Sequence, residues 1–116
     1  MAYTITPHNN IQVLLIDDLW NPDDNQELVE EISTLIEADK KNYVIDFSEL
    51  PYMNSNGLAF LISILTRARS AGGDVVIANI SEKIAQILVM TRLNDMFTTT
   101  DSVDAALEFL QGEITT

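Results

Sequence analysis

Cysteine is absent from this 116-residue sequence, and histidine occurs once. The absence of cysteine excludes disulfide bonds, thiolate catalysis and cysteine-ligated zinc, and it fits a reducing compartment. The single histidine, His8, follows Pro7 in an expected N-terminal turn, and nothing in the sequence places a serine and an aspartate around it as a catalytic triad. We therefore predict a binding protein that is not an enzyme and has no catalytic residues.

Carboxylates are plentiful but are not spaced as metal ligands. Two acidic pairs, Asp17-Asp18 and Asp23-Asp24, share one polar stretch, yet the spacing of a calcium-binding loop is missing. Gly72-Gly73 follows an expected helix and lacks the spacing of phosphate-binding glycines. We predict a solvated loop with a helix cap at the acidic pairs, no metal site and no cofactor.

Positive charge is scarce, with 6 Lys and Arg against 18 Asp and Glu, and a net charge of −12. Such a body repels nucleic acid and anionic membrane surfaces, so we expect neither as a partner. The acidic residues fit a solvated surface, and they also fit electrostatic steering towards a basic partner. Charge alone does not separate these two interpretations.

No hydrophobic run approaches the roughly 20 residues that a membrane-spanning helix needs. The first residues, MAYTITPHNNIQ, contain neither the basic region nor the apolar run of a signal peptide. We therefore expect a cytoplasmic protein without membrane insertion. A single domain over residues 1–116 is long enough to bury roughly two thirds of its surface without disulfides or metals.

Short apolar stretches alternate with segments of helical periodicity. Expected strands cover residues 3–6, which Pro7 closes, then 11–16, 43–47, 74–79 and 96–98. Expected helices cover 25–39, capped by Asp24 or Asn25, then 57–71, a third helix capped by Ser81, and 102–110. We predict an α/β fold in which four helices pack on a mixed β-sheet, because strand–helix–strand order implies parallel crossovers and the opening hairpin adds an antiparallel pair.

Residues 44–58, VIDFSELPYMNSNGL, are the most informative stretch of the chain. An apolar strand ends in a polar loop, and a helical pattern starts directly after Asn54-Ser55-Asn56-Gly57. The start of a helix exposes unpaired N–H groups and partial positive charge, so it favours an anion or a phosphorylated hydroxyl. This pattern is typical of a regulatory loop that leads into a helix.

The same stretch resembles the signature loop of the STAS domain, found in bacterial anti-sigma-factor antagonists, in which a "D-S-[ST]-G-L" segment carries the regulatory phosphorylation site. A second block, AGGDVVIANISEKIAQILVMTRLNDMF, is similar to the run that follows the second helix in this family. The resemblance covers about residues 3–110. It implies the STAS fold and a function in partner switching, in which a kinase phosphorylates the hydroxyl and the phosphate abolishes partner binding.

Within this resemblance the residues correspond one by one. Gly57 and Leu58 take the places of the family's Gly-Leu, Asn56 falls on the usual phosphoacceptor, Ser55 on the preceding serine and Asn54 on the aspartate. An asparagine has no hydroxyl to phosphorylate. Either Ser55 has become the acceptor, or the switch is fixed in one state. These residue types also suit a helix cap by themselves.

The helix over 57–71 shows a second apolar stripe, which contains Phe60 and Ile64 and lies off the inward stripe of Leu58, Leu61, Ile62 and Leu65. We expect Phe60 and Ile64 to extend residues 54–58 into one partner-binding surface, the alternative being burial inside the fold. Trp20 lies in the loop before the first helix, either exposed near the signature loop or covering the edge of the core.

The resemblance implies an anti-sigma-factor antagonist or a close relative, with an anti-sigma factor or related serine-kinase-like protein as its partner. Within the same fold, the alternative is a non-phosphorylated regulatory subunit of a larger signalling or transporter assembly. A small-ligand or nucleotide-binding module is a third hypothesis, and it requires a polar pocket for which the sequence shows no convergent cluster of polar groups.

Overall fold

The computed structural model describes residues 3–115, and their side chains through residue 112. Five strands lie in the order β1-β2-β3-β4-β5. They are β1 (Tyr3–His8), β2 (Ile11–Ile16), β3 (Asn42–Asp46), β4 (Asp74–Ala78) and β5 (Thr98–Thr100). β1 pairs antiparallel with β2, and the other pairs are parallel.

Four α-helices accompany this sheet within the described residues: α1 (Pro22–Glu37), α2 (Ser55–Ser70), α3 (Glu82–Met90) and α4 (Val103–Thr115). A short 3-10 helix, η1 (Leu93–Asp95), follows α3. The predicted fold class, a mixed sheet with four helices packed on it, is confirmed. In the part of the chain that the structure describes, no helix is both long and apolar enough to cross a bilayer.

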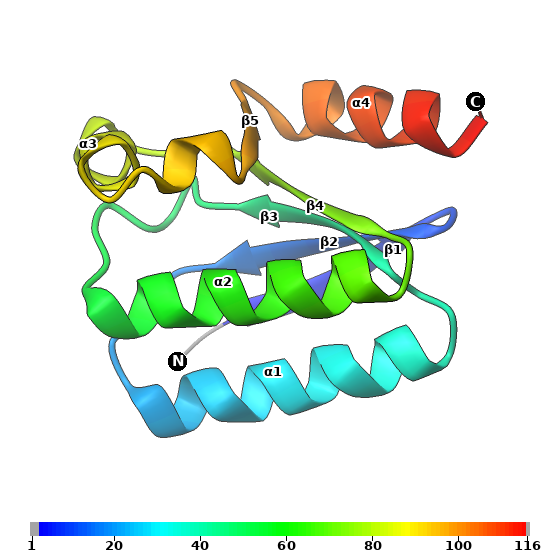
Figure 1. Cartoon of the computed structure of the whole chain (residues 1–116), viewed down its shortest axis with the longest axis horizontal. Coiled ribbons are helices and arrows are strands. Elements are labelled where there is room, and N and C mark those ends of the chain that lie inside the picture. The colour runs from blue at the N-terminus through cyan, green and yellow to red at the C-terminus, as the bar shows by residue number, and fades with distance from the viewer. Residues whose placement is uncertain (1–2, 116) are drawn as a thin grey trace.

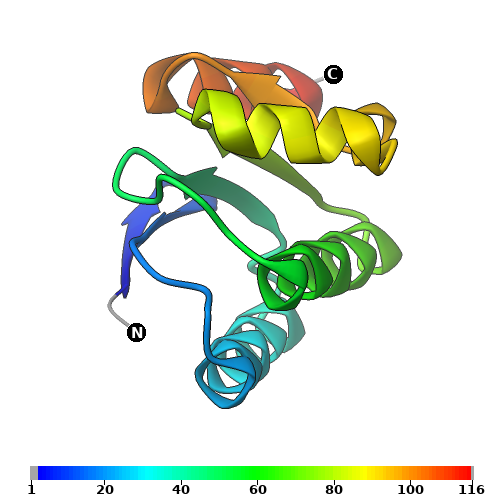
Figure 2. The ribbon, with the colours of Figure 1, turned by 90° about the vertical axis from the view of Figure 1, so that its left-hand side faces the viewer.

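Helices enclose the sheet from both sides (Figures 1 and 2). α1 and α2 lie side by side along one face, and α4 covers the opposite face. The interior strand β4 contributes to both layers, because Val75 and Ile77 belong to the core under α1 and α2, whereas Val76 and Ala78 pack with α4. The predicted strand is therefore buried on both of its faces, and Val76 is fully buried.

α1 begins three residues earlier than predicted. The side chain of Asn21 caps it by accepting the N–H of Asp23 at 2.9 Å, and Pro22 occupies the first helical turn. Proline suits this position because its fixed φ matches the helix and the N–H that it lacks would be unpaired there. The predicted caps, Asp24 and Asn25, therefore lie inside the helix.

Other boundaries also differ from the prediction. β1 continues through Pro7 to His8, which an edge strand tolerates because one side of its backbone has no pairing partner. β5 covers Thr98–Thr100 instead of 96–98, because Met96 and Phe97 both donate their N–H groups to the carbonyl of Leu93, the first residue of η1. α4 continues beyond residue 110 to Thr115.

Candidate functional site

The start of α2 is built around Asn54. Its side-chain oxygen accepts the N–H groups of Asn56 at 3.0 Å and Gly57 at 3.4 Å, and its carbonyl accepts those of Gly57 and Leu58. This cap starts the helix at Ser55, two residues before the predicted boundary, and leaves Ser55 exposed in the first turn. The cap function expected for these residue types is thus confirmed for Asn54.

Gly57 is fixed by a close approach. It is buried, and a Cβ atom at this position would lie 2.8 Å from the Cβ of Met53, which is also buried. Any larger residue would push the loop away from the first turn of α2. The glycine therefore keeps the loop of residues 47–54 folded tightly against the helix that it leads into.

Asn56 turns back towards the loop between β2 and α1, and its Nδ2 donates to the carbonyl of Trp20 at 3.0 Å. Asn25, on the first turns of α1, donates its own Nδ2 to the carbonyls of Leu19 at 2.8 Å and Asn56 at 3.4 Å. The two asparagines thus tie the β2–α1 loop to the start of α2.

Asn25 was not recognised from the sequence as part of this site. It is almost completely buried, and its Oδ1 has no hydrogen-bond partner. A signal was available, since Asn25 lies at the head of the apolar stripe that continues with Leu28, Val29 and Ile32. A polar residue in such a stripe indicates a buried side chain that needs polar partners.

The expectation that Phe60 and Ile64 face outward is wrong. Their side chains are 3% and 0% exposed, whereas Ile62, which was expected to face inward, is 37% exposed. The reason is that α2 packs against α1 on one side and against the sheet on another, so its buried arc is wider than a single stripe. Leu58 is partly buried at the edge of the same core.

Trp20 is exposed beside the start of α2, as one of the two interpretations predicted. Half of its side-chain surface is accessible, and Tyr52, from the loop before α2, is 42% exposed. The two ring centroids lie 5.8 Å apart with the planes tilted by 43°. An aromatic pair therefore lies on the surface next to residues 54–56.

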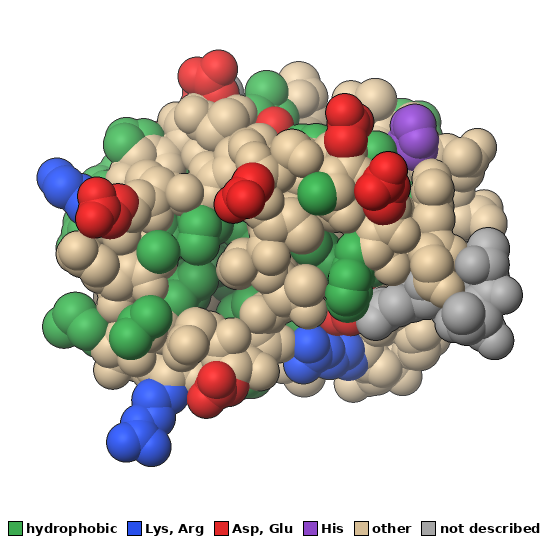
Figure 3. Space-filling view, turned by 90° about the horizontal axis from the view of Figure 1, so that it is seen from above, with side chains coloured by type: hydrophobic (Ala, Val, Ile, Leu, Met, Phe, Trp, Pro, Cys, Tyr) green, Lys and Arg blue, Asp and Glu red, His purple; other side chains and the backbone are tan. Residues whose placement is uncertain are grey.

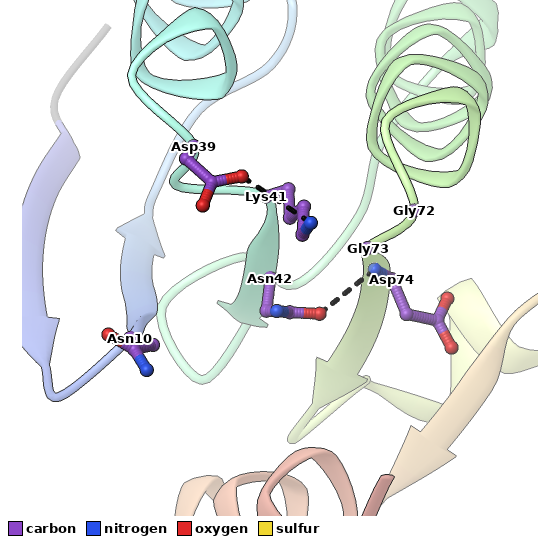
Figure 4. A pocket seen from close by; sticks show the side chains of 7 residues that line it. All are labelled: Asn10, Asp39, Lys41, Asn42, Gly72, Gly73 and Asp74. Carbon is purple, nitrogen blue, oxygen red and sulfur yellow. Dashed lines mark hydrogen bonds and ion pairs between the residues drawn. The ribbon is translucent and has the colours of Figure 1, made fainter. Parts of the chain in front are cut away.

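One hollow borders this site, and another lies at the opposite end of the fold. One, of about 310 Å³, lies between α1 and α2 and is lined partly by Asn25, Asn56 and Phe60. The other, of about 470 Å³, lies at the opposite end, where β3 and β4 begin (Figure 4). This second hollow, here called the polar hollow, was not predicted from the sequence. It is lined by Asn10, Asp39, Lys41, Asn42, Gly72, Gly73 and Asp74.

The groups in the polar hollow bind one another. Lys41 pairs with Asp39 at 3.4 Å, and the N–H of Asp74 donates to the Oδ1 of Asn42 at 3.1 Å, as Figure 4 shows. A Cβ on Gly73 would meet the carbonyl oxygen of Lys41 at 1.9 Å, so the glycine serves close packing. Among the described residues, no group of three or more His, Asp or Glu side chains is arranged to hold a metal ion.

A further apolar area lies on α3. Seen from the side of α3 and α4, hydrophobic side chains gather at the end of the molecule that α3 forms (Figure 3). Val89 and Met90 are largely exposed there and line a shallow hollow with Glu82, Ala85 and Gln86.

The fold and the capped segment at the start of α2 agree with the comparison to known families. The sequence profile of the STAS domain matches residues 23–106. This chain belongs to the STAS domain family. The matched residues include α1 except its first residue, the segment between α1 and α2, and α2 itself. Leu19 and Trp20 lie just before the match.

Several solved structures share the fold at low sequence identity. The anti-sigma factor antagonist SpoIIAA of Bacillus, in its unphosphorylated form, is 15% identical, with a TM-score of 0.82 over 96% of this chain and 97% of that chain. An anti-sigma factor antagonist from Mycobacterium paratuberculosis is 19% identical, with a TM-score of 0.76 over 95% and 93%. A sulfate transporter family protein from Wolinella succinogenes is 13% identical, with a TM-score of 0.80 over 96% and 93%.

Proposed function

We propose that residues 1–116 act as one STAS domain in the cytoplasm, as an anti-sigma-factor antagonist-like regulator. Its partner is an anti-sigma factor or a related serine-kinase-like protein. The observation that carries this proposal is the start of α2, where an exposed serine lies in the first turn of a capped helix, in the segment that resembles the family's signature loop. The similarity to two anti-sigma factor antagonists supports the same class of function.

The proposed contact surface is smaller than the one expected from sequence. It consists of Asn54, Ser55, Asn56 and Leu58, held in place by the buried Gly57. Phe60 and Ile64 support this surface from inside the core and do not contact the partner. Such a surface of polar groups around one partly buried leucine fits a reversible complex, since permanent interfaces are more apolar.

Regulation at this surface differs from the family's usual phosphorylation. Asn56 has an amide in place of a hydroxyl, and the amide is used in the bond to Trp20. Ser55 is the remaining candidate acceptor. It precedes Asn56 by one residue, so its side chain leaves the helix in a different direction from that of Asn56. Because phosphoryl transfer needs the attacking oxygen in line, we propose that the protein remains unphosphorylated and competent to bind.

Affinity capture from the native cell, followed by mass spectrometry, tests the function. The expected result is recovery of an anti-sigma factor or an ATP-binding serine-kinase-like protein with the tagged wild type. The matched variant Ser55→Arg, which alters an exposed position, should lose that protein. Recovery of a membrane transporter or a larger signalling assembly instead would favour the regulatory-subunit function, and recovery of neither would favour a ligand-binding module.

A further inference from the structure

The exposed aromatic pair beside the start of α2 has no role in the contacts described above. Trp20 and Tyr52 come from different loops, yet both expose about half of their side-chain surface and lie 5.8 Å apart. Large aromatic side chains usually bury most of their area, so a paired exposure next to a binding segment indicates an interaction surface.

Both loops are held in place by hydrogen bonds. The N–H of Trp20 donates to Asp18 at 2.8 Å, and its carbonyl accepts from Asn56. On the other side, the hydroxyl of Ser81, which caps α3, donates to the carbonyl of Pro51 at 2.7 Å, directly before Tyr52. The backbone that carries the two rings is therefore fixed by hydrogen bonds, and binding a partner would cost little conformational entropy in these loops.

The charge around the rings is mostly negative. Residues 17–25 contain four acidic side chains and residues 47–57 contain one, and neither segment contains Lys or Arg. The starts of α1 and α2 add a partial positive charge of about half a unit each, which five carboxylates exceed. α1 contains no Lys or Arg, and the cations of α2, Arg67 and Arg69, lie in its last turn, away from the rings. The first turn of α3, whose cap Ser81 bonds to Pro51, adds one carboxylate and one cation, Glu82 and Lys83, which offset each other.

We propose that Trp20 and Tyr52 form a platform for an arginine-bearing segment of the protein partner. The guanidinium plane stacks on an exposed ring face, where the ring quadrupole attracts it, and the surrounding carboxylates add a longer-range attraction. This inference rests on the proposed function for the identity of the partner, and it adds the chemistry by which the partner is recognised.

The test follows the indole N–H of Trp20 by NMR, which is unambiguous because the chain has a single tryptophan. The ¹⁵N-labelled protein is titrated with an end-blocked five-residue peptide of alternating glycine and arginine. A second titration uses the same peptide with citrulline, which keeps the shape of arginine without its charge. We expect a saturable shift of the indole signal with the arginine peptide and none with the citrulline peptide.

Variants separate ring stacking from general attraction to a negatively charged protein. Trp20→Leu keeps every charge and should weaken binding of the arginine peptide at least fivefold, measured on the amides of Tyr52 and Ser55. Trp20→Phe, which keeps a ring face, should restore most of it. The matched control Phe109→Leu removes an exposed ring from α4, on the other side of the sheet, and should change binding less than twofold.

Equal shifts with both peptides, or equal affinity of Trp20→Leu and wild type, would overturn the proposal. The titration uses no cellular protein, so its failure leaves the proposed function standing. Conversely, arginine-peptide binding without any captured regulatory partner would count against the proposed function alone. If the captured partner binds Trp20→Leu as tightly as wild type, the platform does not serve that partner and the inference is wrong.

Discussion

At the scale of single residues, Asn56 has a structural function that a serine in its place would lose. Its Nδ2 lies two bonds beyond the Cβ atom and reaches the carbonyl of Trp20 at 3.0 Å. A serine hydroxyl lies one bond beyond Cβ and would fall short on the same backbone. The residue that we propose replaces the family's phosphoacceptor therefore also fixes the neighbouring loop.

Replacing Asn56 should restore phosphorylation. We expect Asn56→Ser, incubated with a cognate serine kinase and ATP, to incorporate phosphate that maps to the new hydroxyl, while wild type and Ser55→Ala incorporate none. Intact-mass and peptide mapping by mass spectrometry measure this. Phosphate on Ser55 of the wild type would show that the switch has moved by one position and is not lost.

Asn25 offers a test of the connection between the loops. Asn25→Leu removes the donor to the buried carbonyl of Leu19 and should lower the free energy of unfolding by roughly 1–3 kcal/mol. Asn25→Asp should cost more at neutral pH, roughly 3–5 kcal/mol, because it places an unpaired charge against two carbonyl oxygens.

The pH dependence of Asn25→Asp follows from this placement. Burial raises the pKa of the introduced carboxyl group, so the folded variant holds its proton to higher pH than the unfolded chain. The difference in free energy of unfolding between wild type and Asn25→Asp should therefore shrink as the pH falls towards 4. Urea unfolding of both proteins at pH 4.5 and 7 measures this difference. The same difference at both pH values would contradict the burial of this side chain against the carbonyls of Leu19 and Asn56.

Because the side chain of Tyr43 is buried, we expect the folded protein to lose stability at alkaline pH. Burial raises the pKa of its hydroxyl from 10.0 to about 12. Since the folded-state pKa is the higher one, the stabilisation is complete below pH 10 and is lost as the pH rises from 10 to 12. The slope is at most about 1.4 kcal/mol per pH unit for one group.

Urea unfolding between pH 8 and 11.5 measures this loss. The control is Tyr43→Phe, whose stability should fall less steeply, although not to zero, because Tyr3 also has a pKa raised to about 12, through its hydrogen bond to Glu31. Parallel curves for wild type and Tyr43→Phe would show that Tyr43 does not titrate in this range.

At the scale of elements, most strands and helices were predicted because each has a clear periodicity. β2 was predicted to the residue, and β4 was recognised from an apolar run that fits burial on two faces. The ends were less accurate where backbone hydrogen bonds decide them. Nothing in the composition of residues 96–98 shows that the backbone of Leu93 holds Met96 and Phe97 in a turn.

The orientation of α2 was the main error, and its cause is tertiary packing. Phe60 and Ile64 were placed outside because a helix on a sheet needs one buried stripe. The neighbouring helix α1 buries a second apolar stripe of α2, and the sequence alone does not reveal which helices lie side by side. The segment at residues 54–57 was predictable because cap and turn residues act locally, whereas Asn25 joins it across 31 residues of sequence.

The observed orientation of α2 can be tested by comparing two alanine substitutions on this helix. Ile64→Ala removes a fully buried side chain and should lower the free energy of unfolding by roughly 2–5 kcal/mol. Ile62→Ala, one half-turn away and partly exposed, should cost less than about 1 kcal/mol. Urea unfolding of the two variants compares them, and equal costs would mean that the helix is rotated relative to this structure.

At the scale of the whole molecule, charge is segregated along the chain. Residues 1–39 contain no Lys or Arg, and four of the six cations lie at or just after the ends of α1 and α2: Lys40, Lys41, Arg67 and Arg69. The starts of α1 and α2 therefore lie in a mostly acidic part of the chain, although Lys83 occupies the first turn of α3. A partner that approaches the signature segment therefore meets a negative field, which favours basic surfaces and speeds their association at low salt.

The central claim is that the start of α2 binds a protein partner, and calorimetric titration of the purified captured partner tests it most directly. Ser55→Arg should weaken binding at least tenfold, about 1.4 kcal/mol, because it places a bulky cation in the middle of the contact. Glu108→Arg makes a larger charge change at an exposed position of α4 and should bind like wild type. Equal affinities for Ser55→Arg and wild type, or a loss confined to Glu108→Arg, would contradict the claim.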